Sequence, residues 1–444
     1  MEDRDILSSF YANICYYFSG KCSGKCALVK KHKEHLQTEG DFSIVLNLKA
    51  QQKHAHINMH NNEHVCQCES TKFSVSADSG EDGNLEPEKV SKNLVKLSDG
   101  WSLKLLQCSV HNDRLCLFLN RLHTFKTVLF SVLAQETVYG KLPNNYKKVV
   151  LTQDCIKDAE LMMNLTDYRR NVVRNVLVNL LTETGHLVNI DVDSEASYCG
   201  DWQYHLSSKP TEANHANVLI YCGTVSVNTK NGKGGNAVTA DYLRQRSKEL
   251  KEMSRQKHGP QVDNDPKWEA FFNKIGEASL KIDLLSIRPS RSFSVNNGSQ
   301  ETSRNAHFIL YNCARLSAIQ EKYEKKCSEN IYPSLVPLES VDLSLLTKEE
   351  EWDLLTNYLL VYPHVLQSTI EFIDKGKPLP NLLCQFLFSL CGCYSSYYRR
   401  VRVLTESRDH LLPVMFARLY LIKAVECVIH NALRLLGIEP VRYM

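Results

Sequence analysis

The side chains best suited to chemistry with a partner molecule form a tyrosine- and arginine-rich segment near the carboxyl end of the chain. The segment contains Tyr394, Tyr397, Tyr398, Arg399, Arg400 and Arg402. Tyrosine rings stack on unpaired bases, and arginines contact phosphates or stack on bases. Successive side chains of a helix point in different directions, so residues 397–400 cannot all face a core. The segment predicts an RNA-contacting surface; the alternative is that Tyr394 and Tyr397 pack inward while the arginines are only solvated.

Further cations extend the list of candidates for RNA contact. Arg418 lies on the next predicted helix, and Arg442 and Tyr443 lie at the end of the sequence. Arg170 and Arg174 are four residues apart on another predicted helix, where both could track phosphates without reading sequence. A solvated helix face explains single arginines of this kind equally well.

A second group of reactive side chains, between residues 54 and 68, is rich in histidine and cysteine. Its His-x-His and Cys-x-Cys spacings do not fit the paired Cys-x2-Cys frame of structural zinc sites. The sequence also has no Gly-x-Ser-x-Gly element, phosphate loop or methyl-donor glycine loop. We therefore expect neither a metal nor a cofactor.

Composition sets the class of protein. The chain has 444 residues, a hydrophobic fraction of 43% and a formal net charge of +3, which suit two or three globular domains. Because the charge is only mildly basic, a polyanion must be met by a local basic face. The acidic start, the lack of an apolar run near ~20 residues, and sixteen cysteines without a secretory signal predict a cytoplasmic protein with reduced thiols. We expect neither a membrane nor DNA as a partner.

Periodicity divides the chain into three consecutive parts. Residues 1–145 read as a mixed α+β region with a mobile loop near 70–90. Residues 146–302 open with a strand at 147–152, a helix at 166–184 that stops at Gly185, and a strand at 186–192. This βαβ spacing predicts a parallel sheet, followed by polar insertions at 230–235 and 245–265. Residues 303–444 predict four amphipathic helices, so the fold class is α/β plus all-α.

The last third resembles the DALR-type anticodon-binding domain that closes arginyl-tRNA synthetases. The resemblance is carried by the segments 305–319, 349–363, 385–404 and 416–440. Upstream, the approach at 139–151 and the helix at 170–186 resemble the same family at weaker specificity. The resemblance implies a class I, Rossmann-like synthetase core, a tRNA-binding bundle, and a chain end that approaches the anticodon.

The two catalytic signatures of that family are missing. Where the family has His-x-Gly-His at a helix start, this chain reads Leu165-Thr166-Asp167-Tyr168, and Asp167 would repel a triphosphate. Where the family has its basic Lys-Met-Ser-Lys loop, the chain keeps only Lys230 and Lys233 before the family-like stretch 235–241. Each loss removes transition-state contacts of several kcal/mol. We interpret the core as catalytically degenerate, so the chain is not expected to be an enzyme.

Resemblance to DALR-containing relatives of the synthetases implies a more specific role. It implies an adaptor that selects arginine tRNAs and presents them to a tRNA (cytosine-N3)-methyltransferase for 3-methylcytidine formation in the anticodon loop. Two alternatives stay open: an active arginyl-tRNA synthetase, and a protein-interaction scaffold that does not bind RNA.

Overall fold

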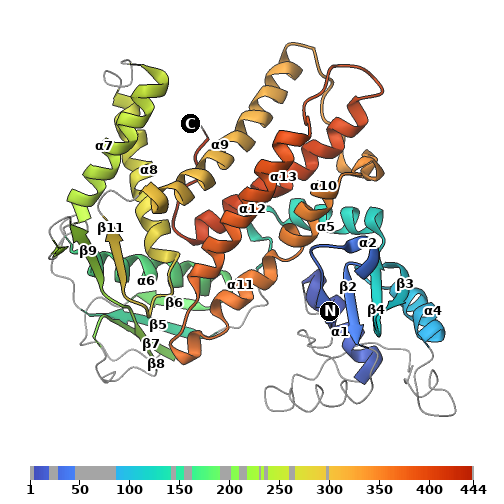
Figure 1. Cartoon of the computed structure of the whole chain (residues 1–444), viewed down its shortest axis with the longest axis horizontal. Helices are drawn as coiled ribbons and strands as arrows, with labels where there is room; N and C mark the ends of the chain where they lie inside the picture. Colours follow the sequence, from blue (N-terminus) through green and yellow to red (C-terminus); the bar gives the residue numbers. More distant parts are fainter. Residues whose placement is uncertain are drawn as a thin grey trace. The chain divides into compact units, whose positions relative to one another are not determined.

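The computed structural model of the chain (Figure 1) forms two compact units that interleave along the sequence. The described residues are 5–19, 29–45, 87–141, 147–154, 163–190, 202–209, 218–229, 232–234, 239–259, 266–296 and 300–442. The first unit comprises Met1–Ala134, Leu335–His364 and Arg408–Leu421, and the second comprises Gln135–Ser334, Val365–Ser407 and Ile422–Met444. This division differs from the three consecutive parts expected, because the last third of the chain contributes to both units. Residues 70–86 of the expected loop lie outside the described residues, and residues 87–90 begin a helix.

The first unit is built on an antiparallel sheet in the order β1-β2-β4-β3. Its strands are β1 (Val29–Lys31), β2 (Phe42–Val45), β3 (Leu105–His111) and β4 (Arg114–Leu119). Its helices include α1 (Ile6–Ser19), α2 (Leu36–Glu39), α4 (Pro87–Ser98) and α5 (Arg121–Gln135), the last residue of which belongs to the second unit. Trp352 is buried beside this sheet and its indole N–H donates to the carboxylate of Asp41 at 2.9 Å. The mixed α+β character expected for this region is confirmed.

The second unit contains the predicted parallel sheet. Its strands are β5 (Lys148–Gln153), β6 (Leu187–Ile190), β7 (Trp202–Ser207) and β8 (Val218–Tyr221). They run parallel in the order β6-β5-β7-β8. The helix between β5 and β6 is α6 (Leu165–Glu183), so the predicted βαβ unit is confirmed. Because the strand order reverses at β5, the carboxyl ends of β5 and β7 form the crevice where sheets of this kind bind ligands.

Local signals fix both ends of α6. The side chain of Asn164 accepts a hydrogen bond of 2.9 Å from the backbone N–H of Asp167, which caps the first turn. Gly185 has a φ of 80°, a left-handed conformation that ends the helix as expected. Between them Val172, Val176 and Leu180 recur at helical spacing and are buried. The apolar face that packs α6 against the sheet can therefore be predicted from the sequence.

One expected insertion is instead largely helical. Residues 245–265 are predicted as a polar insertion, and α7 (Thr239–His258) runs through residues 245–258 of it and packs on α8 (Pro266–Leu285). The inner face of α7 carries Tyr242, Arg246 and Leu250, which are four residues apart and buried. The middle position is an arginine, so the apolar pattern that normally reveals a helix is interrupted. A second, smaller sheet joins β10 (Gly232–Gly234), β9 (Val225–Thr229) and β11 (Phe293–Asn296).

The carboxyl-terminal helices follow the expected order. They are α9 (Gln300–Ser328), α10 (Glu349–Asp353), α11 (Tyr362–Ile370), α12 (Pro380–Arg400) and α13 (Leu412–Leu435). In the second unit α8, α9 and α12 pack side by side (Figure 1). Pro363 lies in the first turn of α11, where its missing N–H costs no helical hydrogen bond. No helix within the described residues is both long and apolar enough to cross a bilayer.

A buried ion pair joins α7 to α8. The guanidinium of Arg246 donates to the hydroxyl of Tyr242 at 2.7 Å and to the carboxylate of Glu249 at 3.0 Å, and lies 4.0 Å from the carboxylate of Asp283. The side chains of Arg246 and Asp283 are 5% and 3% exposed. Burial raises the pKa of Asp283 to about 7, although the charge of Arg246 opposes that rise. Asp283 is therefore a carboxyl group that ionises near neutral pH.

Replacing Asp283 by asparagine should make stability less sensitive to pH. The pKa of Asp283 is about 7 when folded and 3.8 when unfolded, so folding takes up a proton between these values. The stability that this proton contributes is complete below pH 3.8 and is lost as pH rises through 7. Between pH 5 and pH 8 the unchanged chain should lose roughly 3 kcal/mol of unfolding free energy through this group, at about 1.4 kcal/mol for each pH unit between 5 and 7, and Asp283→Asn should not. Urea unfolding at both pH values measures the difference. Asp241→Asn removes an exposed carboxylate on α7 and is the control. If stability depends on pH equally in all three proteins, the raised pKa of Asp283 is contradicted.

Candidate nucleic-acid interface

The tyrosine and arginine segment divides at the last turns of α12 into a buried and an exposed half. Tyr394 and Tyr397 are three residues apart, share the inner face of the helix and are 0% exposed. The prediction that these two rings contact RNA is therefore wrong, and the alternative that they pack inward is what the structure shows. Burial also raises the pKa of the Tyr394 hydroxyl far above its ordinary value. Tyr398, one position further on, is 41% exposed.

The exposed ring of Tyr398 belongs to a three-layer stack across α9 and α12. The guanidinium carbon of Arg315 lies 4.4 Å from the centroid of the Tyr398 ring and 4.5 Å from that of Tyr311. Tyr311 is 42% exposed, so both rings also face solvent. Cation–π attraction holds the guanidinium between the rings and keeps their orientation fixed. Both rings are partly exposed, which would allow a base to stack on them.

Sequence reasoning missed Tyr311 and Arg315. The two residues stand four apart on α9, a spacing that places them on one helix face. Nothing in the sequence pairs them with Tyr398, which lies on another helix far along the chain. Only the packing of α9 against α12 creates the stack.

A second aromatic pair extends the exposed surface along the same two helices. The rings of Phe308 on α9 and Phe388 on α12 lie 5.6 Å apart, and Phe388 is 43% exposed. Both the Phe308–Phe388 pair and the contacts of Arg315 with Tyr311 and Tyr398 join α9 to α12. We call the five side chains Phe308, Tyr311, Arg315, Phe388 and Tyr398 the α9–α12 aromatic surface.

Arginines adjoin this surface where α12 ends. Arg399 and Arg400 are exposed in the last turn of the helix. The backbone then becomes extended at Val401, so that Val401 and Val403 point inward while Arg402 is exposed. The Nε of Arg402 donates to the backbone carbonyl of Leu404 at 3.1 Å, which directs its side chain along the surface. These three arginines stay candidates for contact with phosphates.

The end of the chain follows the helices of the second unit. Val441 is buried, and its backbone hydrogen bonds to the thiol of Cys313 on α9. Arg442 is exposed, and it lies close enough to His430 to add to the lowering of the histidine pKa that burial mainly causes. Arg442 therefore remains a candidate. Tyr443 lies outside the described residues.

Two other predicted contacts are occupied by internal ion pairs. The side chain of Arg170 is 3% exposed and lies between Asp167 at 2.9 Å and Asp154 at 3.3 Å. The side chain of Arg418, in the first unit, is 12% exposed and holds the buried carboxylate of Glu351 at 2.9 Å. The prediction for Arg170 is wrong, because its side chain is buried between two carboxylates. Releasing Arg418 would leave the buried carboxylate of Glu351 without this partner, and RNA contact by the exposed part of its side chain stays a prediction. Arg174 is only partly buried, so its contact with RNA stays a prediction.

A separate polar network fills the described carboxyl ends of β5 and β7. Asp154, directly after β5, accepts hydrogen bonds from the hydroxyl of Ser207 at 2.8 Å and from Nε2 of His205 at 3.1 Å. Burial acts to raise the pKa of Asp154, but these hydrogen bonds outweigh it and hold the pKa below its ordinary value. Asp154 is therefore an anion, with Asp167 on the first turn of α6 joined to it through Arg170.

This arrangement is unfavourable for a triphosphate. A nucleotide in a sheet of this kind places its phosphates at the start of the first helix, where free N–H groups receive them. Here Asn164 already accepts from the N–H of Asp167, and a carboxylate stands in the first turn. Lys230 lies outside the described residues, as does the side chain of Lys233. Among the residues that are described, no group of histidine, cysteine and acidic side chains could hold a metal, and the cluster at 54–68 is not among them.

The comparisons with known proteins agree with this architecture. The model of the DALR anticodon binding domain matches residues 309–444, so the chain carries this domain. The chain is 35% identical over 237 residues to "DALR anticodon-binding domain-containing protein 3" of Rattus norvegicus, covering 52% of this chain and 44% of that protein. The protein of the same name from Danio rerio is 31% identical over 234 residues, covering 50% and 41%. The chain thus spans less than half the length of these relatives, and the predicted resemblance is confirmed.

Arginyl-tRNA synthetases are similar in sequence and in fold. The arginine–tRNA ligase of Malacoplasma penetrans is 30% identical over 178 residues, covering 40% of this chain and 26% of that enzyme. The solved arginyl-tRNA synthetase of Thermus thermophilus superposes with a TM-score of 0.58 at 11% identity, covering 94% of this chain and 96% of that one. The Plasmodium falciparum enzyme gives 0.58 at 9% identity, covering 99% and 98%. These likenesses confirm the fold class: a synthetase-like sheet core followed by a DALR-type helical region.

Proposed function

We propose that this chain, which carries a DALR anticodon-binding domain on a synthetase-like core, is a non-catalytic tRNA-binding adaptor. It recognises arginine tRNAs and delivers them to a tRNA (cytosine-N3)-methyltransferase, which forms 3-methylcytidine in the anticodon loop. The names of the relatives support anticodon binding and the arginine family of tRNAs. The methyltransferase partner follows from the resemblance to DALR-containing relatives alone, and the proposed cytoplasmic location follows from the composition of the sequence.

The observation that carries the proposal is the stack of Arg315 between Tyr311 and Tyr398. An anticodon loop offers unpaired bases, and partly exposed rings give such bases a face on which to stack. Arg399 and Arg402 stand beside the stack, where they can contact the phosphates that flank a stacked base. Stacking and phosphate contact together supply affinity, and neither requires a reaction centre.

The lack of catalysis is supported by the start of α6. A synthetase must bind ATP there, and the carboxylates of Asp154 and Asp167 stand close to that position. Arg170 neutralises only one of these two negative charges, so the site stays unfavourable for a triphosphate. The chain therefore binds its tRNA without charging it.

Removing the ring of Tyr398 should weaken tRNA binding while removing only its hydroxyl should not. Stacking of one base on an aromatic ring is worth roughly 1–3 kcal/mol, so we expect Tyr398→Ala to lose roughly tenfold or more in affinity for arginine tRNA. Tyr398→Phe keeps the ring and is the matched control. Filter binding at fixed salt measures both. Equal affinity of the alanine and phenylalanine variants would exclude stacking at this position.

Charge reversal beside the stack separates phosphate contact from base contact. Arg399→Glu and Arg402→Glu should weaken arginine tRNA and other tRNAs alike, because phosphates carry no sequence information. The slope of affinity against salt concentration should fall by about one for each contact removed. If the unchanged chain binds no tRNA at all, the scaffold alternative is correct instead.

The adaptor role is tested by methylation in a purified system. Arginine tRNA, the methyltransferase and a methyl donor should form more 3-methylcytidine when this chain is added, and Tyr398→Ala should restore less activity than Tyr398→Phe. A chain that binds arginine tRNA yet leaves methylation unchanged is not the adaptor. The synthetase alternative predicts arginine-dependent ATP–pyrophosphate exchange by the chain alone, whereas we expect none.

A further inference from the structure

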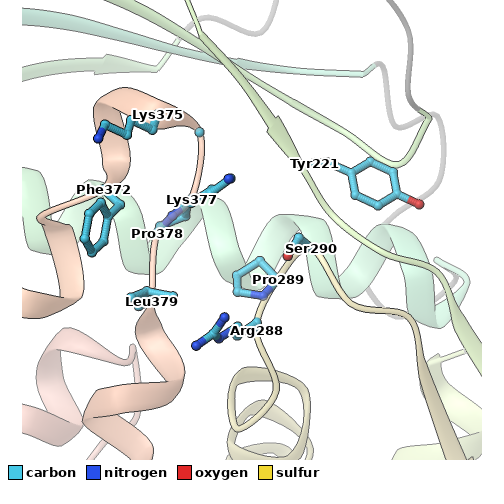
Figure 2. Close-up of a pocket in the computed structure, with 10 residues that line it drawn as sticks. Tyr221, Arg288, Pro289, Ser290, Phe372, Lys375, Lys377, Pro378 and Leu379 are labelled. Atoms are coloured by element: carbon cyan, nitrogen blue, oxygen red, sulfur yellow. The ribbon is translucent and has the colours of Figure 1, made fainter.

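A basic cavity of about 380 Å³ lies in the second unit (Figure 2), and none of the five side chains of the α9–α12 aromatic surface lines it. One wall is the loop after α8, with Arg288, Pro289 and Ser290, and the opposite wall is the loop between α11 and α12. Tyr221, the last residue of β8, contributes from the sheet. None of the lining residues belongs to β5, β7 or α6, so the cavity is distinct from the crevice at the start of α6.

The charges that line this cavity have a single sign. Arg288, Lys375 and Lys377 line it, and no aspartate or glutamate does. Within the described parts of the chain none of the three cations forms an ion pair. The neighbouring Asp374 is engaged by the hydroxyl of Tyr204. The cavity therefore concentrates positive potential that a bound anion would neutralise.

The loop that carries Lys375 and Lys377 is fixed against the edge of the parallel sheet. Gly376 has a φ of 69°, and a Cβ at this position would lie 2.2 Å from the backbone oxygen of Leu219 in β8. Only glycine permits so close an approach in a left-handed conformation. The hydrogen bond from Tyr204 to Asp374 adds a second attachment of this loop to the sheet.

The opposite wall is fixed by buried hydrogen bonds. The guanidinium of Arg169 donates to the backbone oxygens of Ile287 at 3.3 Å and Arg288 at 3.0 Å. The backbone N–H of Gly223 donates to the oxygen of Pro289 at 2.8 Å. Because both walls are already fixed, a ligand that binds here loses little free energy to the ordering of loops, as is typical of a preformed binding site.

The lining also suits a flat ring beside an anion. Phe372 is 38% exposed, and the ammonium of Lys375 lies 5.6 Å from its ring centroid. The 21-residue helix α12 starts beside Leu379, which supplies no side-chain cap, so its N-terminal N–H groups add positive potential to that of the three cations. The volume lies within the range of small-molecule sites.

We propose that this cavity binds a phosphate ester that carries a planar ring, of the nucleoside monophosphate class. Arg288 and Lys377 neutralise the phosphate from opposite walls, and Phe372 offers its ring to the base. The ligand is a free mononucleotide or a single nucleotide of an RNA strand, which share this chemistry. The proposal does not depend on tRNA binding at the α9–α12 aromatic surface.

Isothermal titration of the full chain with AMP, adenosine and inorganic phosphate tests the proposal. We expect AMP to bind with a Kd below about 1 mM and adenosine to bind roughly tenfold more weakly, because charge-assisted hydrogen bonds to phosphate are lost. Lys375→Gln combined with Lys377→Gln should weaken AMP by roughly tenfold or more. Lys248→Gln combined with Lys322→Gln removes the same charge from exposed sites on α7 and α9 and should leave AMP binding unchanged.

The outcomes separate this site from the tRNA surface. Tyr398→Ala should leave the AMP titration unchanged, so a failed tRNA assay does not affect this result. If a short single-stranded RNA competes with AMP, and this competition is lost in the Lys375 and Lys377 double variant, the bound phosphate belongs to RNA. If AMP binds and the RNA does not compete with it, the ligand is a free nucleotide. No AMP binding up to about 1 mM, or equal affinity in the double variant and the unchanged chain, overturns the proposal.

Discussion

The second unit depends on the buried guanidinium of Arg169. This side chain lies in the first turns of α6, is 0% exposed, and donates to four backbone oxygens, those of Gly223, Ile287, Arg288 and Arg291, at 2.6–3.3 Å. Burial lowers its pKa, and carbonyl oxygens in place of a carboxylate keep the charge acceptable. A neutral residue here would leave several buried carbonyls unpaired at roughly 1–3 kcal/mol each. Through Arg169 the start of α6, the end of β8 and the loop before β11 hold one geometry.

That geometry gives the second unit a fold similar to that of arginyl-tRNA synthetases, with two carboxylates near the start of α6. The side chain beside Arg169 is Arg170, which faces two carboxylates instead of carbonyls. At the carboxyl ends of β5 and β7, Asp154 is hydrogen-bonded to Ser207 and His205 and is paired with Arg170. The described surfaces with exposed rings and cations lie elsewhere, on α9 and α12 and in the basic cavity.

Much of the fold could be predicted because its signals are local. Asn164 and Gly185 mark the ends of α6, and its valines and leucines recur at helical spacing. The rotation of a helix is harder to predict than its presence. Tyr397 and Tyr398 are adjacent, yet one is 0% and the other 41% exposed. Helical spacing puts Tyr397 in line with Leu390 and Tyr394, so inward packing was one of the two alternatives, but spacing alone did not decide between them. Because successive side chains of a helix are rotated by about 100°, one of the two adjacent rings faces the core and the other faces solvent.

The remaining errors come from contacts between distant residues. The sequence alone predicts an exposed Arg170, because its partner Asp154 lies at the end of β5 and only the fold brings the two together. The helix α7 is hard to predict because the buried Arg246 interrupts its apolar face. Arg315 was missed because its two tyrosine partners lie on different helices. A polar side chain gains its role from its partners, whereas an apolar residue is predicted to be buried by its type alone.

The central claim is that the exposed faces of α9 and α12 hold an arginine tRNA. Photo-crosslinking of the full chain to arginine tRNA, followed by mass spectrometry of the linked peptides, tests it most directly. The account predicts crosslinks to nucleotides of the anticodon loop at Tyr311 or Tyr398. Crosslinks confined to other parts of the chain, or equal labelling by tRNAs for other amino acids, would contradict it.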